Sequence, residues 1–242
     1  LNCPLSSGIY AGAVRGGHLD VLLYASENIG PPPNGANLLE LATSTEDNRG
    51  WFSKTKKINR NRLAALKWIH KHGYGEWTDE ITLNLCTPDN IPMFDWAFSP
   101  VENGGGGCLW DYRVYDDLSI IGEFDRILTL HNQNPNVKFG TKVVREAIAC
   151  ERLDIADIAI SNAISFDENA ANAFYTAVSI GNIGIMERYY SDKLKLNPID
   201  YTYAMKSEKW YETMQWLKDH NCPWDESVME YAAKFGFVGA LE

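Results

Sequence analysis

A four-residue phrase recurs eight times along the chain, and its spacing constrains the fold more than any other feature. Each copy begins with a residue suited to a turn, continues with a variable and then an apolar residue, and usually ends on a small or acidic one. The copies are Gly17-His18-Leu19-Asp20, Asn61-Arg62-Leu63-Ala64, Asp89-Asn90-Ile91-Pro92, Gly122-Glu123-Phe124-Asp125, Glu151-Arg152-Leu153-Asp154, Gly181-Asn182-Ile183-Gly184, Lys209-Trp210-Tyr211-Glu212 and Gly236-Phe237-Val238-Gly239. They begin 44, 28, 33, 29, 30, 28 and 27 residues apart. This period indicates a repeat array and not one closed core.

Two of these gaps are long because each contains an insertion. The first insertion, at about 44–60, includes Ser44-Thr45-Glu46-Asp47-Asn48-Arg49-Gly50 and a lysine-rich stretch. The second, at about 101–107, includes Asn103 and the four glycines Gly104–Gly107. Residues of these types do not extend helices, so we expect two loops. The sequence therefore predicts a single array over residues 1–242 with about eight repeats.

Composition excludes several classes of protein. A net charge of -10 and a pI near 5.0 argue against a general nucleic-acid or anionic-membrane binder. No apolar run is long enough for a membrane span, and no signal-peptide pattern begins the sequence. The five cysteines lie far apart and form no C-x-x-C pair, which favours a reducing compartment. We expect an intracellular protein, cytoplasmic or within a viral or organellar assembly, and not a secreted one.

The last repeat shows how one unit is built. Asp225 is placed to cap a helix that begins at about residue 226, and Gly236 suits the left-handed conformation that closes it. The apolar stripe between them comprises Val228, Met229, Ala232 and Ala233. The phrase after the glycine opens a second helix, so the predicted unit is helix, tight turn, helix, loop. The predicted fold class is all-α.

Glycine and alanine recur at fixed places in this unit. Four glycines are expected to close first helices with positive φ, namely Gly17, Gly122, Gly181 and Gly236. Glu151 and Lys209 replace the glycine in two repeats, and we expect altered turn geometry there because these residues disfavour the left-handed conformation. Alanines before the turns predict close packing of first helices, with larger residues of the second helices forming an outer layer.

Two phrases resemble a known family. Ala13-Val14-Arg15-Gly16-Gly17-His18-Leu19-Asp20-Val21-Leu22 and Cys222-Pro223-Trp224-Asp225-Glu226 are similar to the divergent ankyrin repeats of large DNA viruses and of algae and other protists. The resemblance covers the whole chain, through these motifs at the two ends and through spacing in the centre. It implies an ankyrin-like helical-hairpin solenoid that binds other proteins. Thr-Pro-Leu-His is absent, and the short period leaves too few residues for the hairpin finger of a 33-residue ankyrin unit. Longer HEAT-like hairpins are the second choice.

The chain begins in a turn at Leu1-Asn2-Cys3-Pro4 and stops at Ala240-Leu241-Glu242, one turn into an expected second helix. Terminal repeats of solenoids normally carry a polar cap, and neither end has one. We therefore expect a segment of a longer protein.

Candidate chemistry yields no catalytic, metal or cofactor residues. His70 and His72 lack the i, i+4 spacing of a helical zinc pair, and His18 is expected to bracket helix ends by hydrogen bonding. No Gly-Lys-Ser/Thr follows Gly104–Gly107, so a flexible loop is expected there instead of a phosphate loop. The carboxylates Asp116-Asp117 and Asp154-Asp157 are interpreted as solvated helix faces.

Two sets of residues could bind a partner. The first insertion concentrates basic residues around Trp51-Phe52, with Arg49, Lys54, Lys56, Lys57, Arg60 and Arg62. It could contact an acidic partner or a phosphate backbone, or it could be a solvated loop. The aromatics Trp68, Trp96 and Trp216 on second helices are expected in the core. Tyr112, Tyr175 and Tyr203 on first helices could reach the concave surface as binding anchors.

The sequence predicts a non-enzymatic protein-interaction module or scaffold that binds through its concave face and inter-repeat loops. A structural component of a large complex or viral particle is the alternative. A contact between the basic loop at 49–62 and nucleic acid or an acidic partner is the lesser alternative.

Overall fold

The structure is a computed structural model that describes residues 8–32, 37–44, 59–191 and 194–240 of the chain. These residues form fifteen α-helices and three 3-10 helices, and no strand occurs among them. The predicted all-α class is therefore confirmed.

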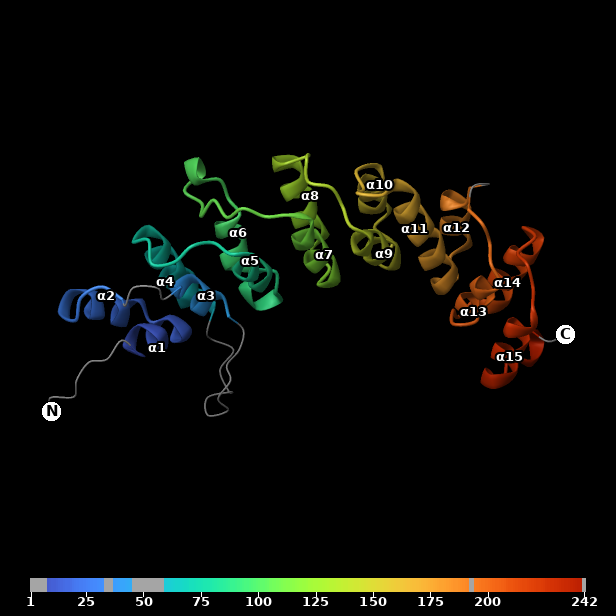
Figure 1. Ribbon diagram of the computed structural model, residues 1–242, viewed down its shortest axis with the longest axis horizontal. Coiled ribbons are helices and arrows are strands. Elements are labelled where there is room, and N and C mark those ends of the chain that lie inside the picture. Colours follow the sequence, from blue (N-terminus) through green and yellow to red (C-terminus); the bar gives the residue numbers. More distant parts are fainter. Residues whose placement is uncertain (1–7, 33–36, 45–58, 192–193, 241–242) are drawn as a thin grey trace. The chain divides into compact units, whose positions relative to one another are not determined.

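The chain divides into two compact units, Leu1–Ile121 and Gly122–Glu242, and each is considered separately (Figure 1). The N-terminal unit contains α1 (Gly8–Gly16), α2 (Leu19–Asn28), α3 (Leu38–Thr43), α4 (Asn59–Lys71), α5 (Asp79–Leu85), α6 (Ile91–Ala97) and α7 (Tyr112–Ile120), with 3-10 helices at Pro88–Asn90 and Val101–Asn103. The C-terminal unit contains α8 (Phe124–Gln133), α9 (Thr141–Ala149), α10 (Leu153–Ser161), α11 (Phe166–Ile180), α12 (Ile183–Tyr189), α13 (Ile199–Ala204), α14 (Trp210–Asp219) and α15 (Glu226–Phe235), with a 3-10 helix at Val238–Ala240.

Odd-numbered helices, which we call first helices, pack on one another within each unit. In the N-terminal unit α1 packs on α3, α3 on α5 and α5 on α7; in the C-terminal unit α9 packs on α11, α11 on α13 and α13 on α15. Even-numbered helices are the second helices. Within each unit α2, α4, α6, α10, α12 and α14 pack on the first helix that precedes them. Each unit is thus a succession of helix pairs.

Small and large side chains are divided between the two kinds of helix less cleanly than predicted. First helices bury Ala13, Ala42, Ala147, Ala173, Ala177, Ala204 and Ala232, as the pattern predicts. Second helices also bury Ala25, Ala65, Ala97, Ala156 and Ala159. Large rings are buried on first helices too, at Tyr10, Tyr115 and Phe174. The size of the buried side chains therefore does not separate first helices from second helices.

Four first helices end in the same hydrogen-bonded turn. The residue in the left-handed conformation donates its N–H to the carbonyl three residues before it, and the next residue donates to the carbonyl five residues before itself, which defines a Schellman motif. The second set of bonds joins His18 to Ala13, Arg152 to Ala147, Asn182 to Ala177 and Phe237 to Ala232, at 2.8, 2.8, 3.1 and 2.9 Å. Every acceptor in this set is a buried alanine.

All four predicted turn glycines have positive φ. Gly17, Gly181 and Gly236 stand in three of these Schellman turns with φ of 68, 72 and 75°, and Gly122, which follows α7, has φ of 78°. Glu151 has φ of 57°, so its turn has the glycine geometry, and the expectation of altered geometry there was wrong. Its two Schellman bonds outweigh a left-handed cost of about 1–2 kcal/mol. Lys209 does depart from that geometry, with φ of -101°.

The anchor at Asn61 lies inside α4, which begins at Asn59, and not at a turn before a helix. The predicted turn is therefore not at Asn61, and residues 45–58, which precede this helix, lie outside the described ranges. At Asp89 the anchor lies in the 3-10 helix that leads into α6.

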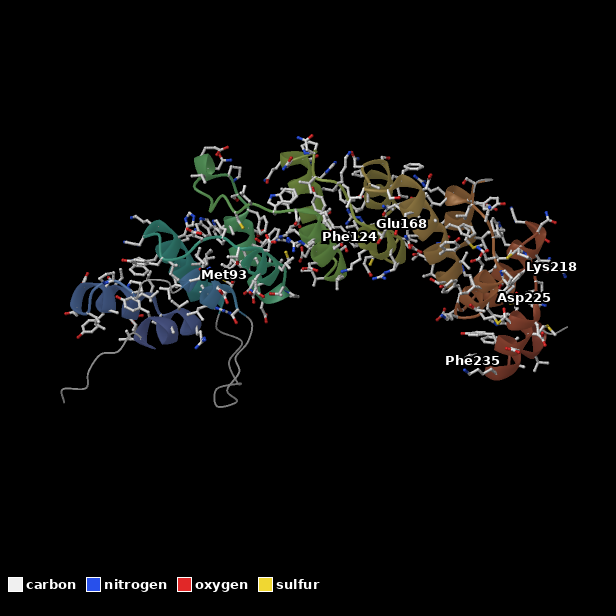
Figure 2. The ribbon with its side chains drawn as sticks, viewed as in Figure 1. Met93, Phe124, Glu168, Lys218, Asp225 and Phe235 are labelled. Atoms are coloured by element: carbon white, nitrogen blue, oxygen red, sulfur yellow. The ribbon has the colours of Figure 1, made fainter. Side chains whose placement is uncertain are left out.

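The last repeat follows its prediction at both ends of α15. Asp225 Oδ1 accepts the Ser227 N–H at 3.0 Å, and Gly236 closes the helix. Figure 2 shows Asp225 at one end of this helix and Phe235 at the other. Only half of the predicted stripe is buried, because Met229 and Ala233 are exposed while Val228 and Ala232 are fully covered.

The four-glycine loop is held by backbone and indole hydrogen bonds, which argue against the expected flexible loop. Three backbone N–H groups of the loop, those of Gly105, Gly106 and Gly107, donate to the backbone carbonyls of Pro100, Trp96 and Ser99, at 3.0, 2.8 and 3.1 Å respectively. The indole N–H groups of Trp96 and Trp77 donate to the carbonyls of Gly104 and Gly106, at 3.0 and 3.1 Å. A Cβ on Gly105 would lie 2.0 Å from the Ser99 carbonyl oxygen. These glycines therefore permit a close backbone approach as well as conformational freedom.

Glu151→Gly is expected to raise the free energy of unfolding by roughly 1 kcal/mol, because glycine adopts positive φ without a Cβ clash. The reciprocal change Gly122→Ala is expected to lower it by a similar amount, since a Cβ there meets no atom within 4 Å and only backbone strain remains. Urea unfolding followed by circular dichroism measures both. Shifts of the same sign in the two variants would contradict this account of the turns.

Gly105→Ala is expected to cost more than about 2 kcal/mol, because its Cβ would overlap the Ser99 backbone. Gly104→Ala is the matched control, with a positive φ but no atom within 4 Å of its Cβ, and should cost about 1 kcal/mol. Urea unfolding monitored by tryptophan emission reports on both, since Trp77 and Trp96 bond this loop. Equal, small effects would mean that the loop is loosely held.

Candidate partner-binding surfaces

Tyr175 and Tyr203 lie on α11 and α13, neighbouring first helices that pack on each other. Both side chains are half-buried, and the Lys206 ammonium lies 5.0 Å from the centroid of the Tyr203 ring. Burial raises the pKa of Tyr175, the nearby charges of Asp200 and Tyr203 add to the rise, and a hydrogen bond with Asn197 opposes it. These two predicted anchors therefore share one surface, which we call the tyrosine face.

Asn197, just before α13, joins the tyrosine face to the core. Its backbone N–H donates to Asp200 Oδ2 at 2.8 Å, its side chain bonds Tyr175 and donates to the Lys195 carbonyl, and its own carbonyl accepts from Cys222 Sγ at 3.2 Å. Burial is the main cause that raises the pKa of the Cys222 thiol to about 12. This cysteine is thus a buried hydrogen-bond donor.

Asp200 is a fully buried carboxyl group with one unsatisfied oxygen. Its Oδ2 accepts the Asn197 N–H, but its Oδ1 is buried without a hydrogen-bond partner. Burial raises the pKa of Asp200, and the bond from Asn197 only partly opposes the rise. Neither Asn197 nor Asp200 was singled out from the sequence. The available signal was an acidic residue, Asp200, three positions after an asparagine, a residue type that often begins a helix.

Tyr112 lies in the other unit, so its position relative to the tyrosine face is not defined. It is the first residue of α7 and its side chain is 40% exposed. Asp111 caps this helix by accepting the Arg113 N–H at 2.9 Å. The predicted set of three tyrosines is therefore split between the two units.

A small hollow of about 190 Å³ lies between α5 and the start of α7, and Tyr112 is not among its lining residues. It is lined by Asp79, Thr82, Leu83, Leu109, Trp110, Asp111 and Arg113. The Arg113 guanidinium binds Asp111 through Nε and Nη2 and reaches Asp79 through Nη2 at 2.6 Å. These contacts raise the pKa of Arg113 and lower that of Asp111. Because the groups are largely solvated, the ion pairs add little stability and mainly fix geometry.

Leu109 lies at the rim of this hollow with 86% of its surface exposed. Its neighbours are anchored: the Cys108 N–H donates to the Ala97 carbonyl at 2.8 Å, and the Trp110 ring lies 5.2 Å from the buried Tyr115 ring. Sequence reasoning missed Leu109. The only signal was an apolar residue two positions after the glycine run that ends at Gly107.

Only the C-terminal end of the basic insertion, from residue 59, belongs to the described residues. Lys54, Lys56 and Lys57 lie outside the described residues. Arg62, grouped with them from the sequence, belongs to α4 and is 8% exposed, so its assignment to a loop was wrong. Its Nη2 donates to the Ser44 carbonyl at 2.7 Å, just after the end of α3, where a cation is favourable.

Histidines and tryptophans have packing roles in the described ranges. The His18 side chain makes no capping hydrogen bond to α2, so the predicted bracket is absent at that helix end. His70 lies 5.5 and 5.4 Å from the rings of Trp77 and Trp96, while His220 stacks on Trp216 at 3.6 Å. Of the tryptophans expected in the core, Trp216 is buried, whereas Trp68 and Trp96 are half-buried.

No cluster of three or more metal-binding side chains occurs among the residues that the structure describes. In the same ranges no helix combines the length and apolar character needed to cross a membrane. Comparison with known proteins adds no relative, since no family model, curated protein or solved structure matches the chain.

Asp200→Asn is expected to raise the free energy of unfolding at pH 7 by about 1–2 kcal/mol, because the neutral amide removes a buried charge and keeps an acceptor for the Asn197 N–H. The folded-state pKa of Asp200 lies above its ordinary value of 3.8, so wild-type stability falls as pH rises between those two values.

The gain from Asp200→Asn should therefore shrink toward pH 3, where the wild-type carboxyl is protonated in both states. Urea unfolding at several pH values tests this, with the exposed Asp219→Asn as the control for a lost negative charge. A gain independent of pH would contradict the buried-charge explanation.

Proposed function

We propose that this chain is an ankyrin-like helical-hairpin array that acts without catalysis, as a module that binds another protein. The binding surface is formed by first helices and the loops that precede them. The observation that carries this proposal is the succession of mutually packed first helices in each unit, with Tyr175 and Tyr203 on two neighbouring ones.

Repeat packing favours recognition of a protein over binding of a small molecule. A succession of helix pairs, each in contact with its neighbours, exposes a continuous surface. The hollow between α5 and the start of α7 measures about 190 Å³, below the roughly 300–1,000 Å³ typical of small-molecule sites. Aromatic side chains with two rotatable bonds make strong anchors, because little conformational entropy is lost when they are buried.

A structural component of a large assembly is the second candidate. It is favoured by the exposure of Ile164, just before α11, and of Phe166, its first residue, each 61% exposed, and of Val238 at 65%. A permanent assembly would cover such side chains. Light scattering across a concentration series separates the candidates, because the assembly component should associate or aggregate alone and the binding module should stay dispersed.

Tyr203→Ala is expected to weaken binding of the partner at least about tenfold, the loss typical of an aromatic anchor. The partner is first identified by quantitative mass spectrometry of proteins retained by the purified chain, and its Kd is then measured by calorimetry. Tyr211→Ala is the matched control, a tyrosine 59% exposed on the second helix α14, and should change Kd less than about twofold. If Tyr203→Ala still binds the partner tightly and Tyr211→Ala loses affinity, the binding site lies on the second helices and not on the first helices.

A further inference from the structure

We propose that the Gly104–Asp111 loop and the adjacent hollow form a docking site for one large apolar side chain of a basic peptide segment in a partner protein. The inference rests on the proposed function as a binding module, and it adds a second surface, in the N-terminal unit, with a defined partner chemistry.

The first argument is the way this loop is held. Backbone bonds fix Gly105, Gly106 and Gly107, and two indole N–H groups add bonds to loop carbonyls. Neither Gly105 nor Gly106 has open space for a Cβ. A connection that only spans from α6 to α7 does not require such ordering. A loop that presents a side chain at a fixed position does, because preorganisation lowers the entropy lost on binding.

The second argument is what the loop presents. Leu109 is the most exposed large apolar side chain of the described residues, although Cys108 and Trp110 on either side of it are held. Covering one leucine contributes about 1.5–3 kcal/mol. Beside it, Leu83 and Trp110 supply further apolar wall. The hollow of about 190 Å³ suits a single side chain of leucine, methionine or phenylalanine size.

The third argument is charge, which selects a basic segment. The rim of the hollow carries two acidic side chains, Asp79 and Asp111, and one basic side chain, Arg113. Glu80, next to Asp79 in the sequence, is exposed and adds a further negative charge. The Nε and Nη2 donors of Arg113 are already directed at the two aspartates. An acidic segment would therefore meet carboxylates and a guanidinium that is already paired. Lysine or arginine residues flanking the apolar anchor would complement the rim.

The test is selection of peptides from a displayed random 12-residue library on the purified chain, with counter-selection on Leu109→Ser. Peptides that discriminate are expected to carry a large apolar residue flanked by Lys or Arg. They should bind Leu109→Ser at least about tenfold more weakly, since the loss of one covered leucine corresponds to at least that factor. Ile120→Ser is the matched control, because this side chain is 56% exposed at the other end of α7 and lies outside the hollow.

A charge arm completes the test. Asp79→Asn should lower the affinity of the selected peptides and make that affinity less dependent on salt concentration. Because Asp79 is exposed, circular dichroism should show that the variant folds like the wild-type chain. The proposal is overturned if no peptide discriminates between the wild-type chain and Leu109→Ser, or if the peptides that do so are acidic. It is also overturned if nucleic acid displaces the peptides equally well from the wild-type chain and from Leu109→Ser. If Leu109→Ser still binds the partner found through the tyrosine face while no peptide discriminates, the docking site fails and the binding module stands.

Discussion

The rest of this structure depends on one backbone turn, the Schellman closure after a first helix. It reverses the chain within a few residues, so the second helix returns along the helix just completed. In all four instances, the hydrogen bond of this turn that spans five residues is accepted by the carbonyl of an alanine. Because that alanine is buried, the position that closes the turn is also one at which the helix meets its neighbours. Local geometry and packing between helices are therefore set by the same residue.

This coupling explains which parts of the fold were predictable. The turn glycines and the Asp225 cap act within a few residues of chain, so their sequence signals are local and reliable. The prediction for Glu151 was wrong because it considered the residue type alone. Two backbone hydrogen bonds and the packing around Ala147 outweigh the preference of a glutamate against the left-handed conformation. That preference concerns the residue alone, whereas the outcome is decided by the whole turn.

The candidate sites were harder to predict because their residues interact across distances that the sequence does not reveal. A run of glycines looks the same whether it is free or fitted against Ser99 and Trp96. Likewise Arg62 is one of several basic residues in the chain, and only the position of Ser44 shows that it belongs to the interior. Tyr175 was predicted as an anchor, but the contacts through Asn197 that position it depend on α13 and Cys222.

Glu151 also bears on how this chain can change over generations. A residue held in an unfavourable conformation is a stability reserve that a single substitution to glycine can release. Such a reserve matters for a surface under selection, since substitutions that create new contacts usually lower stability. Changes on the tyrosine face or at Leu109 could be tolerated in a chain that first gained glycine at 151. The strained turn would then set the order in which new binding properties can arise.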